Sequence, residues 1–452
     1  MSRVILANTG SAAMAPSAHA LSDEFLRTNA GSAKRLLWLA RDGDMLITPT
    51  PVTPEFLSYV NCLKGGSNIT LLSTSSTPTR RPLPISEKDI APGSAFFRAL
   101  HLTAAGTQFS CLEPYIADEV SSSIAAVLGD LPVRFSNQDV RVSPVATRRL
   151  NDKEKFRQFA SDLGVPIANG SNCASTQQLV DAVCKVLSES DSAILKMARH
   201  AGGDGNIVVS KSAARSSQGA RRSVTAPYVD TVTLRETVHE LGLSPTTEEP
   251  VIVEVYSENE SSMGVHFDVR RDNIELVGVA SILFNPGYGG AYWSSALLDH
   301  LPNDVLSWCK SLGSYAQEIG YFGPLSVDIV RAKEVGFFAC EVNGRHGGFS
   351  AIRAVSKALG LEFDIKNGSR VALSRNCISI ALRFPDLIDL LQRKQLHYRP
   401  ADKRGVIVMA EGHQDAGPYD FVIFGRDLDE LQGIERELAQ LSHTRNSLRR
   451  QH

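Results

Sequence analysis

The segment that decides the fold runs from Gly320 to Gly348 and reads GYFGPLSVDIVRAKEVGFFACEVNGRHGG. Apolar residues dominate 325–330 and 337–343, and a polar run separates them, so the pattern predicts two short strands. A turn over 332–335 joins these strands. The segment therefore predicts a mostly apolar hairpin.

Three polar side chains converge at the end of this hairpin. Glu341 and Asn343 point the same way because side chains alternate faces along a strand, and the turn puts Asp328 nearly opposite Glu341. Burying like charges together is costly unless a cation lies between them. Oxygen ligands of this kind suit Mg²⁺. The alternative is an ordinary hairpin that carries acidic residues on a solvent-exposed face.

The sequence that follows the second strand adds a cation and two glycines. The run Glu341-Val-Asn343-Gly-Arg345-His-Gly-Gly resembles the metal-binding signature of the ATP-grasp superfamily, in the form seen in biotin carboxylase and L-amino-acid ligases. The resemblance implies that Asp328, Glu341 and Asn343 hold Mg²⁺ and that Arg345 stabilises a developing oxyanion. It also implies substrate contacts from the residues that follow, which are His346, Gly347 and Gly348.

The bulk composition limits the function classes. The 452 residues are 43% hydrophobic, enough for two or three domains with cores. The 47 basic and 49 acidic residues give a net charge of -2, which argues against nucleic acid or an anionic membrane surface as the main partner. Seven scattered cysteines without a C-x-x-C pair suit a reducing compartment. The apolar run near the N-terminus is too short for a signal peptide, so we expect a cytoplasmic protein.

The chain divides into three parts by pattern. Residues 1–148 alternate strand-like and helix-like runs, which predicts a small α/β domain with a parallel sheet. Residues 149–376 carry the ATP-grasp resemblance, with a lid at about 191–260. Residues 377–452 predict a small α+β cap, similar to the one that closes biotin-carboxylase-like folds. We therefore expect a multidomain α/β and α+β chain with an ATP-grasp fold.

A helix starts at 151–154. Asn151 is expected to cap it with Glu154 three residues on, and Gly164 ends it. By itself this is only a well-made helix. The pattern Asn-Asp-Lys-x(10)-Gly-Val-Pro also resembles the entry to the ATP-grasp fold, which implies that Lys153 reaches nucleotide phosphate.

A lysine and a glycine-rich turn follow in the predicted lid. Lys196 lies in the apolar strand 193–198, where a lysine either extends to water or meets an anion. Glycines in the next turn allow the backbone to approach a phosphate closely. A lone glycine-rich turn is weak support, but the order strand, lysine, loop, strand resembles the ATP-grasp lid. The implied phosphate contacts are Lys196, Gly202, Gly203 and Gly205.

The strand at 251–256 has a polar end and resembles the one that borders adenine in this superfamily. The resemblance implies base contacts from the peptide groups of Val255 and Tyr256, and places Glu254 near the exocyclic amine. It also implies that Glu260 reaches the ribose. The alternative is a plain strand with a polar end.

Two further segments are candidates for substrate contact. Arg270 and Arg271 follow the strand 263–269, and either of them, or Arg345, could meet the transferred phosphate, although a solvated turn is the alternative. Residues 285–295 form a run rich in glycine and aromatic side chains, which predicts a loop that shapes a pocket and includes Ser294, or an ordinary connection.

Two departures from relatives narrow the expected reaction. The strand of Asp328 lacks the arginine that D-alanine ligases carry just before that aspartate, which favours Arg345 for oxyanion stabilisation. Residues 281–295 lack the lysine-bearing bicarbonate-binding run of biotin carboxylase. The short N-terminal domain, the Asn-Gly-Arg-His-Gly-Gly run and the length most resemble the peptide-ligase type of pheganomycin biosynthesis, within antibiotic biosynthesis.

The resemblance implies a carboxylate–amine ligase that uses ATP and Mg²⁺ and releases ADP and phosphate through an acyl phosphate. The expected substrates are an amino acid, such as a modified phenylglycine-like residue, and the N-terminal amine of a peptide. A homodimer is expected by analogy with proteins of the same fold. We do not expect a nucleic acid or a membrane as a partner. The alternatives are a biotin-carboxylase-like carboxylase and a non-catalytic nucleotide-binding protein.

Overall fold

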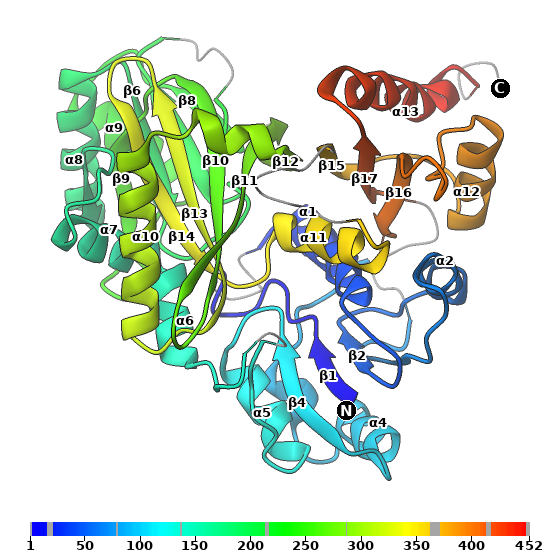
Figure 1. The fold of residues 1–452 in the computed structure, drawn as a ribbon. Coiled ribbons are helices and arrows are strands. Elements are labelled where there is room, and N and C mark those ends of the chain that lie inside the picture. The colour runs from blue at the N-terminus through cyan, green and yellow to red at the C-terminus, as the bar shows by residue number, and fades with distance from the viewer. Residues whose placement is uncertain are drawn as a thin grey trace.

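The structure is a computed structural model that describes residues 2–15, 21–77, 80–135, 138–212, 217–285, 287–361, 371–412 and 417–448. Within these ranges the strands form three sheets of four, eight and five strands (Figure 1). No helix in the described ranges is long and apolar enough to cross a membrane.

The N-terminal part is the predicted parallel α/β unit. Its sheet has the order β3-β2-β1-β4, and all three pairings are parallel. The first helix of this unit, α1, is continued directly by the 3₁₀ helix η2. The strands are β1 Ser2–Leu6, β2 Met45–Thr48, β3 Thr70–Ser73 and β4 Phe109–Pro114, and the helices are α1 Asp23–Ser32, η2 Ala33–Trp38, α2 Pro54–Lys64, α3 Glu87–Ile90, α4 Ala95–Ala104 and α5 Glu119–Val127.

The central sheet has eight strands in the order β14-β13-β10-β11-β12-β15-β17-β16. The predicted hairpin is confirmed and is longer than expected, since its strands span Gly323–Ala332 and Gly336–Gly344. The other strands are β10 Asn259–Val269, β11 Ile274–Asn285, β12 Gly287–Trp293, β15 Val371–Ile378, β16 Gly405–Ala410 and β17 Tyr419–Gly425, and the nearby helices are α6 Pro144–Asn151, α7 Lys153–Asp162, η3 Ser295–His300, α10 Asn303–Glu318 and α11 Gly348–Ala358.

The lid is a separate five-stranded sheet, β5-β9-β6-β7-β8, drawn in green in Figure 1. Its apolar face packs on two helices. The strands β6, β7 and β9 are buried along most of their length, whereas the edge strands β5 and β8 are mostly exposed. The strands are β5 Gly170–Cys173, β6 Ser192–Met197, β7 Asn206–Ser210, β8 Arg222–Thr225 and β9 Val251–Val255, and the helices are α8 Thr176–Glu189 and α9 Thr231–Glu240.

The C-terminal strands extend the central sheet. β12 pairs with β15 through Tyr292 opposite Leu373 and Trp293 opposite Ala372, so β15 to β17 continue one hydrogen-bonded ladder. The proposed domain boundary at residue 376 therefore lies inside β15. Two helices, α12 Phe384–Arg393 and α13 Leu428–Leu448, accompany these strands.

Two local predictions are wrong. Asn151 does not cap the helix after it, because it ends α6, and Asp152 accepts the N–H groups of Glu154 and Lys155 as the N-cap of α7. The run at 285–295 is not a loop, because most of it is strand β12, which pairs with β11 from Asn285 opposite Gly287 onward. Glycines and aromatic residues are here the components of a tight hairpin.

Candidate functional site

One cavity of about 690 Å³ lies where the three sheets meet. Its lining includes the predicted metal ligands on β13 and β14, the lysine strand β6 and the start of α11. It also includes residues of η2 and β15, so the N-terminal unit and the C-terminal strands both contribute walls. Such a junction between units is a common place for a ligand site.

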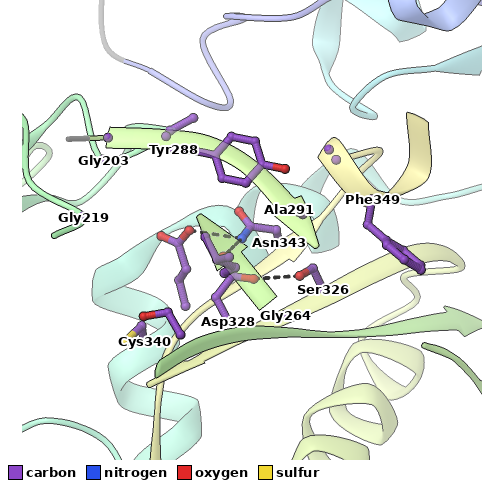
Figure 2. Close-up of a pocket in the computed structure, with 18 of the residues that line it drawn as sticks. Gly203, Gly219, Gly264, Tyr288, Ala291, Ser326, Asp328, Cys340, Asn343 and Phe349 are labelled. Carbon is purple, nitrogen blue, oxygen red and sulfur yellow. Dashed lines mark hydrogen bonds between the residues drawn. The ribbon is translucent and has the colours of Figure 1, made fainter. Parts of the chain in front are cut away.

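The three predicted metal ligands lie together as expected. Asp328 is directly opposite Glu341 across the β13–β14 pair. The Nδ2 of Asn343 donates to Asp328 Oδ2 and to Glu341 Oε1, both at 3.1 Å, and Ser326 donates its hydroxyl to Asp328 Oδ1 at 2.7 Å (Figure 2). The amide nitrogen of Asn343 thus stands between the carboxylates, as a cation would.

The electrostatics of this group fit a divalent cation. Burial, together with the charge of Glu341, raises the pKa of Asp328 to about 7. Burial also acts to raise the pKa of Glu341, but Lys153, Asn343 and Arg345 outweigh it and hold that pKa at about 2. A cation beside Asp328 would offset the unfavourable proximity of the two carboxylates. The described residues contain no group of three or more His, Cys, Asp or Glu side chains placed to hold a metal ion. A site with two carboxylates therefore needs further oxygens, as Mg²⁺ takes from phosphates and water.

Lys153 reaches this group from α7. Its Nζ lies 3.1 Å from Glu341 Oε2 and donates to the carbonyl of His200 at 2.6 Å. Only 7% of the residue is exposed, and it lines the cavity. Lys153 therefore bridges the hairpin and the start of the glycine-rich loop, which is a position from which a lysine can meet a phosphate.

Lys196 is held by a carboxylate. Its Nζ lies 2.5 Å from Glu254 Oε2, both residues are buried, and Arg157 of α7 also pairs with Glu254. Burial acts to lower the pKa of Lys196, but Glu254 outweighs burial and keeps that pKa above its ordinary value. Lys196 is therefore a fixed positive charge in the cavity wall, and Glu254 is engaged by two cations.

The glycine-rich loop closes on neighbouring backbone. Gly203 has φ +74°, and a Cβ there would lie 2.6 Å from the carbonyl oxygen of Gly219. The carbonyl of Gly202 accepts the Tyr288 N–H at 3.1 Å, which ties the loop to β12. Both glycines line the cavity, whereas Gly205 is not among its described lining residues and instead packs against the ring of His200.

The predicted adenine strand lines the cavity but offers fewer donors than expected. The N–H of Val255 bonds to the Asn169 carbonyl at 2.9 Å, and that of Tyr256 bonds to the Ser192 carbonyl at 3.0 Å. These two N–H groups are therefore committed within the protein. Glu260 is not among the described lining residues, and its half-exposed side chain pairs with Arg331 at 3.2 Å.

Of the three arginines considered for the transferred phosphate, Arg345 is the one that lines the cavity. It donates to Asn151 Oδ1 through Nη1, and its buried Nε has no partner among the described residues. Arg270 and Arg271 lie in the turn between β10 and β11 and are not among the described lining residues, and Arg270 pairs with Glu275 at 2.5 Å.

The residues after Arg345 also line the cavity. His346 is buried and its Nε2 lies 3.3 Å from Glu113 Oε1. Gly347 and Gly348 begin α11, and a Cβ on Gly348 would lie 1.9 Å from the hydroxyl of Tyr288. Ser294 is elsewhere, because it caps η3 and is not among the described lining residues.

Several lining residues escaped the sequence interpretation. They come from elements that only the tertiary structure brings to the cavity, and no local motif marks them. Tyr288 lies in the aromatic run that had been noted, which was the one available signal. The main members of this set are Arg35, Glu113, Tyr115, Tyr288, Arg353 and Asn376.

Comparison with known proteins agrees with this architecture. Residues 33–130 match the sequence model of the Pre ATP-grasp domain, and residues 386–438 match that of the PGM1 C-terminal domain. No curated protein is recognisably related to the chain by sequence.

Solved structures resemble nearly the whole chain. An ADP complex of PurK, N5-carboxyaminoimidazole ribonucleotide synthetase, has a TM-score of 0.55 and 12% identity over 92% of this chain and 96% of that one. Biotin carboxylase from Campylobacter jejuni has a TM-score of 0.55 and 13% identity, over 95% of this chain and 88% of that one. L-amino acid ligase from Bacillus licheniformis has a TM-score of 0.51 and 13% identity, over 97% of this chain and 96% of that one. At this identity the similarity concerns the fold, and the chain is a mixed α/β multidomain protein with the ATP-grasp fold.

Proposed function

We propose that this protein is an ATP-dependent carboxylate–amine ligase that forms an amide through an acyl phosphate. The observation that carries the proposal is one cavity in which two carboxylates and an amide lie beside three cationic side chains. Those cations are Lys153, Lys196 and Arg345. The set matches what phosphoryl transfer requires, namely a metal site and fixed positive charge around phosphate oxygens.

Asp328, Glu341 and Asn343 would hold Mg²⁺. When bound, the ion neutralises the negative charge on the phosphate oxygens. Lys153 and Lys196 supply charge that does not need to reorganise, because Glu341 and Glu254 already fix their positions. The glycine-rich loop brings backbone close to the same space and excludes water from it.

The reaction has two steps. An oxygen of the substrate carboxylate attacks the γ-phosphorus of ATP, a new O–P bond forms, and the bond to the leaving ADP breaks. An amine then attacks the acyl carbon, a C–N bond forms, phosphate leaves, and the amine gives up a proton. Arg345 lies between the hairpin and α11, where its unpartnered Nε can stabilise negative charge on the acyl oxygen.

We propose an amino acid as the acyl donor and the amine of a peptide as the acceptor, as in the peptide-ligase type of pheganomycin biosynthesis, an antibiotic pathway. An apolar and aromatic stretch of the wall supports a donor with an aromatic side chain, such as a phenylglycine-like residue. In that stretch the rings of His266 and Phe349 stack with centroids 4.2 Å apart. Burial lowers the pKa of His266 to about 3, with Arg353 acting in the same direction, so this ring is a neutral surface.

A carboxylase is the second candidate, because PurK and biotin carboxylase share the fold. Bicarbonate is a small anion and has no use for the apolar stretch around Phe349. A carboxylase would consume ATP in the presence of bicarbonate and be indifferent to an added amine, which separates the two candidates.

The test is phosphorus NMR of ATP and Mg²⁺ with the protein and a mixed pool of amino acids and short peptides. ADP and phosphate that appear only when both a carboxylate and an amine are present support the proposal, and the new amide is then identified by mass. AMP and pyrophosphate would overturn it. ATP binding with no turnover under any mixture would favour a non-catalytic nucleotide-binding protein.

A further inference from the structure

A buried arginine from the N-terminal unit lines the cavity with a free nitrogen. Arg35 of η2 is 9% exposed, and its Nη1 is buried with no hydrogen-bond partner among the described residues. Its Nε donates to the Ser32 carbonyl at 3.0 Å and lies 3.6 Å from Asp420 Oδ2. Leaving a buried charged donor unsatisfied costs stability, so a free Nη1 in a cavity wall needs an explanation.

A matching acceptor lies on the neighbouring wall. The pairing of β15 with β17 shifts register between Arg375 and Ile378, and Cys377 has φ +58°. This bulge turns Asn376 and Cys377 to the cavity. The Oδ1 of Asn376 is buried and has no partner among the described residues. Backbone strain at such a bulge is often associated with a functional role.

One carboxylate joins the two walls. Asp420 of β17 accepts the Cys377 N–H at 2.9 Å through Oδ1, and its Oδ2 accepts the Ser32 hydroxyl at 2.8 Å and faces Arg35. Asp420 thus already accepts hydrogen bonds from two donors, and Arg35 Nη1 still has no acceptor among the described residues. The unpartnered donor and the unpartnered acceptor are therefore neighbours across a single side chain.

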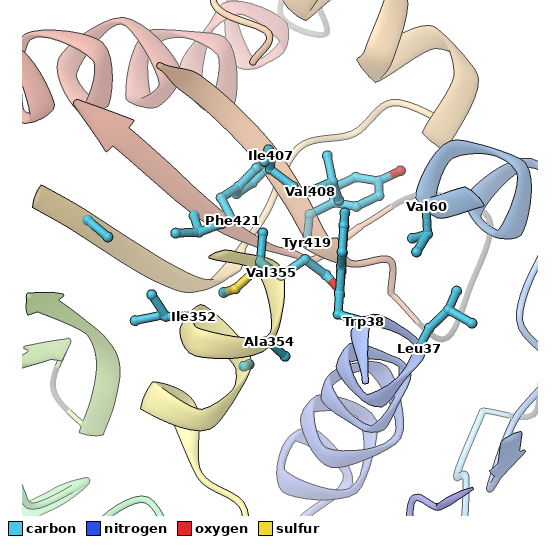
Figure 3. Packing of buried hydrophobic residues seen from close by; sticks show 14 of the residues in the cluster. Leu37, Trp38, Val60, Ile352, Ala354, Val355, Ile407, Val408, Tyr419 and Phe421 are labelled. Atoms are coloured by element: carbon cyan, nitrogen blue, oxygen red, sulfur yellow. The ribbon is translucent and has the colours of Figure 1, made fainter. Parts of the chain in front are cut away.

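Packing holds Arg35 in place before any ligand binds. Trp38, from the same 3₁₀ helix, donates its indole N–H to the Met409 carbonyl at 3.0 Å. Leu37 and Trp38 belong to one hydrophobic cluster with C-terminal residues that include Val408 and Tyr419 (Figure 3). Because the element is fixed on the C-terminal strands, the guanidinium loses little freedom on binding a ligand.

Tyr288 lies between this pair and the metal group. Its hydroxyl lies against Gly348 at the start of α11, and its side chain lines the same cavity. Burial raises the pKa of the Tyr288 phenol to about 12, with Arg35 acting to lower it and Asp328 to raise it. A ligand bound at Arg35 and Asn376 would therefore extend past Tyr288 toward the hairpin. That direction suits a substrate whose reacting end lies at the metal group.

We propose that Arg35 and Asn376 bind the first peptide group of the amine-bearing substrate, the carbonyl on Arg35 Nη1 and the following N–H on Asn376 Oδ1. The inference rests on the proposed function and makes it more specific, because a free amino acid has no second N–H to offer. The acceptor is then a peptide, held by its backbone, with its terminal amine directed past Tyr288.

Ligand-observed NMR titrations in the presence of Mg²⁺ and ADP test the proposal without any turnover. The probes are alanyl-alanine, alanyl-lactate, in which an ester oxygen replaces the peptide N–H, and free alanine. The wild type should bind alanyl-alanine about tenfold more tightly than alanyl-lactate, since one lost hydrogen bond in a buried site is worth about 1–1.5 kcal/mol. Free alanine, which lacks the whole peptide group, should bind more weakly still. Arg35→Gln should weaken alanyl-alanine binding about tenfold. Asn376→Leu should abolish the preference for alanyl-alanine over alanyl-lactate.

A matched control lies one residue away. Arg375 pairs with Glu435 of α13 and is not among the described lining residues, so Arg375→Gln should leave all three affinities unchanged. Retained ADP binding shows that a variant has folded. Arg35→Lys keeps the positive charge and serves as the conservative variant at this position. Equal affinities in wild type and Arg35→Gln, or no saturable binding of alanyl-alanine to the wild type, would overturn the proposal. Failure of the proposed function would appear separately, as absence of ADP formation.

Discussion

The polar groups that the chain buries away from the cavity differ from those that line it. Arg3 of β1 donates to both oxygens of Asp44, and Lys34 pairs with Glu411 and donates to the carbonyl of Gly412. In the cavity, by contrast, Asp328 faces Glu341, and Arg35 keeps a nitrogen without a partner. We call the first kind of group complete, because other protein groups satisfy its charge and hydrogen bonds. We call the second kind incomplete, because part of its charge or hydrogen-bonding capacity has no partner among the described residues.

Buried polar atoms without a partner are over-represented at the cavity, although others lie elsewhere in the described ranges. Ten buried side-chain nitrogen or oxygen atoms in the described ranges have no partner, and four of them belong to residues that line the cavity, namely Arg35, Arg345, His346 and Asn376. Because buried polar groups are normally satisfied, this concentration indicates a ligand that completes them. The complete groups should therefore matter for stability, and the incomplete ones for binding and turnover.

The largest effect should come from breaking a complete pair. Lys34 is 1% exposed, and its Nζ lies 3.0 Å from Glu411 Oε1. Lys34→Met leaves a buried carboxylate without its cation, which should lower the free energy of unfolding by about 3–5 kcal/mol. Urea denaturation measures this change, and ADP binding by the folded fraction should not change.

The exposed pair of Arg393 and Asp389, whose atoms lie 2.9 Å apart, is the control. Arg393→Met should cost no more than about 1 kcal/mol, because solvent screens exposed ion pairs. If the two substitutions destabilised the chain equally, the distinction between the buried and the exposed pair would be lost.

The next largest effect should come from an incomplete group. Glu341→Gln removes one of the two carboxylates of the metal site, and the turnover of ATP should fall on the order of a hundredfold or more. The free energy of unfolding should fall less than in Lys34→Met, because the loss of the Lys153 pair is offset in part by the removal of a like charge beside Asp328. Glu334→Gln, in the turn of the same hairpin, is the control and should leave turnover unchanged. Near-wild-type turnover of Glu341→Gln would falsify the metal assignment.

Metal removal gives a somewhat smaller effect on the same group. With Mg²⁺ and ADP at a hundred times the dissociation constant, the wild type should gain about 2.7 kcal/mol of stability. Most of this gain should disappear when EDTA removes Mg²⁺. The stabilisation that remains is the part of ADP binding that Lys153 and Lys196 provide without the metal. Thermal melts with and without EDTA measure the difference, and equal shifts would show that the carboxylates do not hold the ion.

Much of the incomplete group could be predicted from the sequence. Two strands of alternating residues and one short turn fix the pairing of Asp328 with Glu341, so local rules were sufficient. The lysine strand and the parallel N-terminal sheet followed in the same way from strand patterns. The expected ligand contacts of Glu260 and Arg270 could not be predicted as well, because a surface charge can pair with any neighbour. In the structure Glu260 pairs with Arg331 and Arg270 pairs with Glu275.

Arg35 and Asn376 could not be predicted. The pattern around Arg35 does not differ from that of other arginines in helices, and its exposure to the cavity depends on where β15 and β17 dock. The bulge at Asn376 depends on the register of two strands that are far apart in the chain from η2. The run at 285–295 shows the same limit, because glycines favour a loop locally and only pairing with β11 makes it a strand.

The smallest effect tests the shape of the cavity between the two groups. A Cβ on Gly348 would lie 1.9 Å from the Tyr288 hydroxyl, so Gly348→Ala should push the phenol aside and raise the Michaelis constant for the second substrate by up to about tenfold. Stability should change by no more than about 1 kcal/mol, because alanine is favourable in a helix. The neighbouring Gly347→Ala is a close control, since a Cβ there meets nothing within 4 Å. Adding Tyr288→Phe to Gly348→Ala should restore part of the affinity, because it removes the atom in closest contact. If Gly347→Ala and Gly348→Ala behaved alike, Tyr288 would not lie on the path between Arg35 and the metal group.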